Sequence, residues 1–150
     1  MNIQIVYGST GGNTQLVCQF VTQQLEAAGF NVNCDRCEHF PVENLIGHDL
    51  LILAAPTYEH GQLEDHMRIS FWPRIQSLDL QKQACTVIGL GDHKYDTDYH
   101  IESARILEKY VLTHNGEMAF PKLMVSRCPL GQLDGLVDKW VQKIIKNLHE

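Results

Sequence analysis

A loop rich in hydroxyl side chains and glycine follows the first apolar run of the chain, residues 3–7, and comprises Ser9, Thr10, Gly11, Gly12, Asn13 and Thr14. Where a strand ends in such a loop and a helix follows, backbone N–H groups, hydroxyls and the positive end of the helix dipole converge, which suits a phosphate. The loop lacks the Gly-Lys-Ser/Thr ending of nucleoside-triphosphate loops and the spaced glycines of dinucleotide folds. It therefore fits a single terminal phosphate best, with a ligand-free helix cap as the alternative.

Two further loops carry side chains suited to binding a flat ring. One comprises Pro56, Thr57, Tyr58, Glu59, His60 and Gly61, and the other comprises Gly89, Leu90, Gly91, Asp92, His93, Lys94 and Tyr95. Tyr58 and Tyr95 can stand on the two faces of a ring, and each aromatic pair adds about 0.5–1.5 kcal/mol. We expect a tight Gly89–Gly91 turn that lets backbone N–H groups reach the ring edge, with Asp92 accepting from a ring N–H. The alternatives are a surface tyrosine and a turn-forming aspartate.

Strands and helices alternate along the chain. The patterns predict strands at 3–7, 30–34, 49–55, 84–90 and 118–125, and helices at 14–28, 63–77, 99–113 and 133–148. We expect Pro73 to bend or divide its helix, and Pro121 to mark a strand that begins there or lies at an edge. The prediction is an α/β fold with a doubly wound five-stranded parallel sheet, order 2-1-3-4-5, and helices on both faces. In that order the three loops meet at the carboxyl edge.

Composition limits the function classes. The 150 residues, 44% hydrophobic, fit one domain spanning 1–150. The net charge of −6 argues against nucleic acid and anionic membranes as partners. Five cysteines are a poor disulfide framework, and the first residues lack a basic secretion region, so we expect a cytoplasmic protein. We also expect a monomer.

Other candidate residues have structural explanations. Cys34 and Cys37, followed by His39, could form a dithiol or half a zinc site, but no second ligand pair with metal spacing occurs, so no metal is expected. If the second strand continues, these two cysteines point to opposite faces and pack as small hydrophobes. We also expect core positions for Cys18, Cys85, Trp72 and Trp140.

The chain resembles the flavodoxins along its whole length. Residues 9–14 match Ser/Thr-x-Thr-Gly-Asn-Thr, residues 57–61 match a threonine, an aromatic and a short turn, and residues 89–95 match Gly-x-Gly-Asp-x-x-Tyr. The resemblance implies a short-chain flavodoxin that binds flavin mononucleotide (FMN). Its phosphate would lie in the first loop, its isoalloxazine between Tyr58 and Tyr95, and its pyrimidine edge at the backbone of Leu90, Gly91 and Asp92. The resemblance also implies a low-potential one-electron carrier between a reductase and acceptor enzymes, which dock at the flavin edge.

Several positions depart from the family pattern, among them Asp98-Tyr99-His100, where the family often has Phe-Cys-Gly. Gly11 replaces a threonine, which predicts weaker phosphate binding, and Tyr58 replaces the commoner tryptophan. In the family the peptide after the position of Glu59 turns over on one-electron reduction. A glutamate in left-handed space costs roughly 1–2 kcal/mol, so we expect a less stable semiquinone than with glycine. A redox titration of Glu59→Gly tests this.

Charged side chains in these loops are expected to set the potential. The candidates for an acidic rim are Glu59, Glu64, Asp65, Asp92, Asp96 and Asp98. Such a rim would disfavour the anionic reduced flavin and steer a basic partner, although an ordinary solvated acidic surface is the alternative. We also expect His60 or His93 to make the low potential pH-dependent.

Three other function classes remain in view. A phosphorelay receiver needs acids where the chain has Gly8-Ser9 and Ala55-Pro56, so that interpretation is poor. A small FMN-dependent NAD(P)H:quinone-type reductase is the main alternative, but it needs an open flavin face that Tyr58 and Tyr95 would close. The third is an interaction module that binds no flavin.

Overall fold

The structure is a computed structural model that describes residues 1–58, 62–91, 101–126 and 128–149. Its sheet runs in the order β2-β1-β3-β5, with β6 and β7 both pairing with β5, and all of these pairs are parallel. The strands are β1 (Asn2–Tyr7), β2 (Asn31–Arg36), β3 (Leu50–Tyr58), β5 (Ala84–Gly91), β6 (Glu117–Met118) and β7 (Leu123–Ser126). The predicted strand order is confirmed, with β5 as the fourth strand and β6 and β7 together as the fifth.

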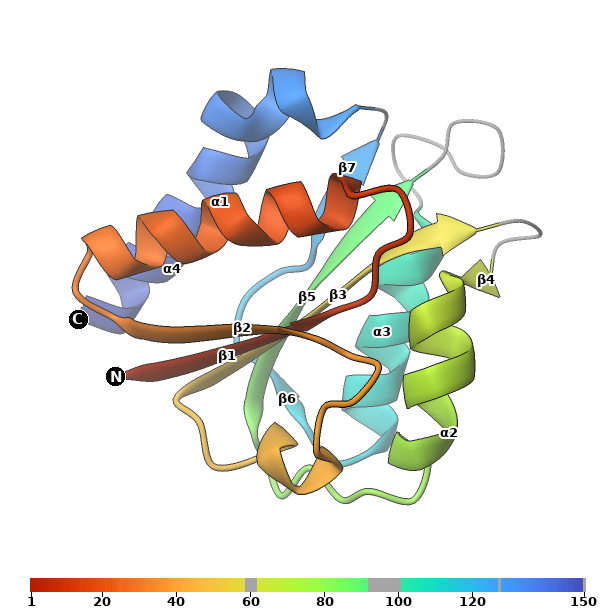
Figure 1. Cartoon of the computed structure of the whole chain (residues 1–150). Coiled ribbons are helices and arrows are strands. Elements are labelled where there is room, and N and C mark those ends of the chain that lie inside the picture. The colour runs from red at the N-terminus through yellow and green to blue at the C-terminus, as the bar shows by residue number, and fades with distance from the viewer. Residues whose placement is uncertain (59–61, 92–100, 127, 150) are drawn as a thin grey trace.

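Helices cover both faces of this sheet (Figure 1). Helices α1 (Asn13–Ala27) and α4 (Asp138–His149) pack on one face, and α3 (Glu102–Thr113) and the segment leading into α2 (Trp72–Ile75) pack on the other. Shorter helical segments are the 3₁₀ turns Val42–Leu45 and Pro129–Gln132 and the π-helical turns His66–Phe71 and Leu133–Val137.

The central strands carry apolar side chains on both faces because helices cover both faces of the sheet. Each residue from Leu50 to Ala55 is 1% exposed or less. Ile52 belongs to the core under α1 and α4, whereas Leu51 and Leu53 belong to the core on the opposite face. Each such side chain contributes about 1.5–3 kcal/mol through burial, which fixes the strand ends that carry the loops.

Proline explains why one predicted helix and one predicted strand are each divided in two. The predicted 63–77 helix divides into the π-helical His66–Phe71 and α2, and Pro73 lies in the first turn of α2, where no N–H donor is needed. The predicted 118–125 strand is broken between β6 and β7 around Pro121, which has no N–H for the ladder. A short strand that was not predicted, β4 (Gln62–Leu63), pairs antiparallel with the end of β3.

Gly89 lies inside β5 and Gly91 is its last residue, so the expected tight turn from Gly89 to Gly91 is wrong. A Cβ on Gly89 would lie 2.5 Å from the Cβ of Ala104 on α3. This glycine is therefore required for the close approach of α3 to the sheet.

The cysteine and tryptophan predictions are confirmed. Cys34 packs on the α1 side of the sheet and Cys37 is buried on the other, while Cys18 and Cys85 are fully buried. Trp72 packs against one core, and Trp140 is 9% exposed within the other. Among the described residues, no cluster of three metal-binding side chains occurs and no helix is long and apolar enough to cross a bilayer.

Candidate functional site

The loop between β1 and α1 is held in a fixed shape. Its start is tied to the sheet by the Gly8 N–H, which donates to the Ala54 carbonyl at 3.0 Å. The Gly12 N–H donates to Ser9 Oγ at 3.1 Å, so this buried hydroxyl oxygen closes the turn. Gly12 has φ 87°, a left-handed conformation that favours glycine.

Several donors of this loop have no acceptor. Within the described part of the chain, no group accepts from the N–H of Thr10, Gly11, Asn13 or Thr14. The Thr14 side chain is 0% exposed, and its Oγ1 is the only fully buried side-chain polar atom in the described segments without a partner. A buried unsatisfied group costs about 1–3 kcal/mol. Unpaired donors at a helix start therefore point to an anionic ligand.

Glu64 links this loop to the segment after β3. Its side chain is 0% exposed, and its carboxylate accepts from Thr10 Oγ1 at 3.2 Å and from the Met67 N–H at 3.2 Å. It also accepts from the N–H of His66 and lies 3.0 Å from His66 Nδ1. The carboxylate thus caps the π-helical turns and holds Thr10, so the expectation of Glu64 in an exposed acidic rim is wrong. Asp65, by contrast, is exposed and pairs with Arg68 at 3.1 Å.

Arg36 is a cation at this loop that the sequence reasoning missed. It is the register partner of Tyr7, and its guanidinium donates to the Ser9 carbonyl at 2.6 Å and to Glu38 at 2.8 Å. Burial alone would raise the pKa of Glu38, but the hydrogen bond and charge of Arg36 hold it below its usual value. The parallel register of the first two strands was the only available signal, because it sets residue 36 beside residue 7.

The ends of β3 and β5 are joined through the start of α3. Thr57 Oγ1 accepts from the Ser103 N–H at 3.0 Å, and Ser103 Oγ donates to the Leu90 carbonyl at 3.4 Å. Thr57 and Ser103 are both buried. Thr57 therefore caps α3, and its predicted contact with a cofactor stays a prediction.

The predicted residues that the structure describes converge on one edge. Pro56 and Leu90 are register partners at adjacent strand ends, and Gly91 pairs with Ser126. Tyr58 ends β3, but its side chain lies outside the described structure. Also outside the described residues are Glu59, His60, Gly61, Asp92, His93, Lys94, Tyr95, Asp96 and Asp98.

These contacts define a class: a doubly wound α/β protein whose ligand edge presents donors to an anion. The flavodoxin family model matches residues 5–140, so the chain belongs to the flavodoxin family, whose members are electron carriers that bind FMN. The orphan hydroxyl of Thr14 and the unpaired N–H groups fit the phosphate of that cofactor.

Individual relatives agree with this assignment. A flavodoxin of Nitratidesulfovibrio vulgaris is 25% identical over 150 residues, covering 98% of this chain and 99% of the relative. An NADPH-dependent diflavin oxidoreductase 1 of Danio rerio is 27% identical over 145 residues, but the match spans only 24% of its length and 93% of this chain. The solved Streptococcus pneumonia TIGR4 flavodoxin has a similar fold, with a TM-score of 0.85 and 21% identity, covering 98% of this chain and 99% of that one.

Proposed function

We propose that this protein is a low-potential carrier that moves single electrons between a reductase and acceptor enzymes. It would act as a monomer in the reducing cytoplasm, in keeping with its five free cysteines. The observation that carries the proposal is the set of unpaired donors at the start of α1, including the buried hydroxyl of Thr14.

Each of the three loops would contact a different part of FMN. The segment Ser9–Thr14 would bind the phosphate. Arg36 would hold this loop through its hydrogen bond to the Ser9 carbonyl. Tyr58 and Tyr95 would flank the isoalloxazine, with Pro56, Thr57 and the 59–61 turn beside it. The backbone of Leu90, Gly91 and Asp92 would meet the pyrimidine edge.

FMN, when bound, supplies the redox chemistry, and the chain's own residues bind and orient it. The donor set contains no lysine that could hold a second phosphate, so it selects a mononucleotide. The hydrogen bond between Thr10 and Glu64 ties the first loop to the segment after β3. The bond between Thr57 and Ser103 ties the end of β3 to the start of α3. Both bonds would hold these segments in place around a bound FMN.

A carrier and a reductase differ in their reaction with a nicotinamide. The FMN-loaded protein should accept electrons from a flavodoxin reductase and react negligibly with NADPH alone in anaerobic stopped-flow mixing. Rapid direct reduction by NADPH, followed by transfer to a quinone, would show the reductase function instead. A matched control replaces NADPH with dithionite, which should reduce the bound flavin in either case.

A further inference from the structure

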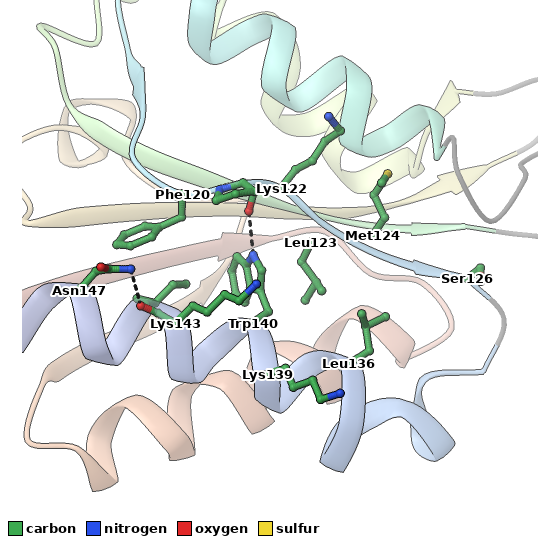
Figure 2. A pocket seen from close by; sticks show the side chains of 12 residues that line it. Phe120, Lys122, Leu123, Met124, Ser126, Leu136, Lys139, Trp140, Lys143 and Asn147 are labelled. Atoms are coloured by element: carbon green, nitrogen blue, oxygen red, sulfur yellow. Dashed lines mark hydrogen bonds between the residues drawn. The ribbon is translucent and has the colours of Figure 1, made fainter.

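A trench of about 540 Å³ runs between β7 and α4, on the side of the sheet away from the β2 edge (Figure 2). Its exposed apolar side chains are Leu136 and, in part, Phe120, while the buried side chains of Leu123, Trp140 and Ile144 form its floor. Trp140 is held in place by its indole N–H, which donates to the Pro121 carbonyl at 2.8 Å. The site described above does not use any of these residues.

The strand beside this trench is an edge. Among the described strands, β7 pairs only with β5, so its other side has no partner strand. Leu123 points down towards α4, whereas Lys122 and Met124 point to the opposite face (Figure 2). An added strand would continue this alternation and place every second side chain over the trench.

Two lysines give the trench a local positive charge in a chain of net charge −6. Lys139 and Lys143 lie one helical turn apart on α4, both exposed, and neither has an acidic partner in the described structure. Lys122 differs, because it pairs with Glu108 at 3.2 Å on the other face. The trench therefore combines apolar contact area with two unpaired cations.

We infer that this trench binds an extended acidic segment of a partner protein. The segment lies beside β7 as an added strand. Its side chains that face the trench are apolar beside Phe120 and Leu136 and acidic at Lys139 and Lys143. From Leu136 to Asn147 the helix rises about 16 Å, which matches about five residues of an extended strand. Such a segment would hold a partner at the side of the sheet and leave the carboxyl edge uncovered.

The test uses a blocked octapeptide with threonine at every second position and valine and glutamate taking turns at the others, so that both face the trench. It is titrated calorimetrically into the full chain, with and without FMN. We expect saturable binding that weakens with added salt, and no binding of the same peptide with lysine for glutamate. Lys143→Glu should weaken binding about tenfold, whereas the matched control Lys109→Glu, on exposed α3 surface, should change it less than about twofold. Hydrogen exchange should show added protection of those backbone N–H groups of Leu123–Val125 that do not already donate to β5.

Binding that Lys143→Glu leaves unchanged, or the absence of any binding at millimolar peptide, would overturn the inference. So would binding of decanoate with no binding of the peptide, because the trench would then be a site for a small amphipathic anion. Since the assay does not need FMN, its outcome is separate from the test of electron transfer.

Discussion

Replacing Glu64 with glutamine should tighten FMN binding. Glutamine has nearly the same shape, so its amide oxygen can still accept from the N–H groups of His66 and Met67. Its amide nitrogen can donate to Thr10 Oγ1, which reverses that hydrogen bond and leaves the Thr10 proton available to a phosphate. The substitution also removes a buried negative charge beside the site where a phosphate would bind.

The size of the effect follows from the geometry. Thr10 Oγ1 lies 3.2 Å from the Glu64 carboxylate. A phosphate oxygen that accepts from this hydroxyl at about 2.7 Å would lie about 6 Å or less from the carboxylate. Two unit charges at that separation interact by about 3 kcal/mol at an effective dielectric of about 20. Because Thr10 is exposed and solvent screens the pair, we expect about half of this, or about tenfold in affinity.

The assay is a fluorescence titration of the apoprotein with FMN and, in parallel, with riboflavin, which lacks the phosphate. Glu64→Gln should tighten FMN about tenfold and leave riboflavin unchanged. The matched control Asp65→Asn makes the same chemical change one residue further on, at an exposed side chain, and should alter neither ligand. Weaker FMN binding in Glu64→Gln, or an equal change for both ligands, would refute the electrostatic reasoning.

Three further predictions follow from burial. Thr14→Val should leave the stability of the apoprotein unchanged or slightly raised, because the lost hydroxyl has no partner, yet weaken FMN about tenfold in the same titration. Gly89→Ala should lower the free energy of unfolding by about 1–3 kcal/mol in urea, because its Cβ would meet Ala104, whereas Gly131→Ala meets no atom and should not. Burial raises the pKa of the Cys85 thiol to about 12 from 9.0. The folded state then keeps a proton that the unfolded chain loses, so stability falls as the pH rises from about 9 towards 12, and Cys85→Ala should flatten this fall in urea unfolding curves.

The strand order and the gathering of loops at one edge were predictable because burial on both faces leaves a strong pattern. The almost unbroken apolar run at 49–55 has one explanation in a 150-residue chain, a central parallel strand. The hydroxyl-rich loop was predictable because its residue types act through local backbone geometry. Glycine at position 12 is needed by the left-handed turn that the structure contains.

Contacts between segments far apart in the sequence were not predictable. Glu64 reads as one more acid in a polar stretch, and only the packing of the 62–71 segment against the first loop buries it. Gly89 reads as a turn residue, yet its role depends on the approach of Ala104 from α3. Arg36 required the register of two strands. In each case the deciding partner lies more than ten residues away.

The most direct measurement is the binding of FMN to the purified wild-type protein, followed by quenching of flavin fluorescence. We predict one FMN per chain, a yellow complex, and at least about tenfold weaker binding of riboflavin, because the donors of the first loop would have no phosphate to bind. A protein that stays colourless with excess FMN and does not quench its fluorescence would contradict the account, as would equal affinity for the two flavins.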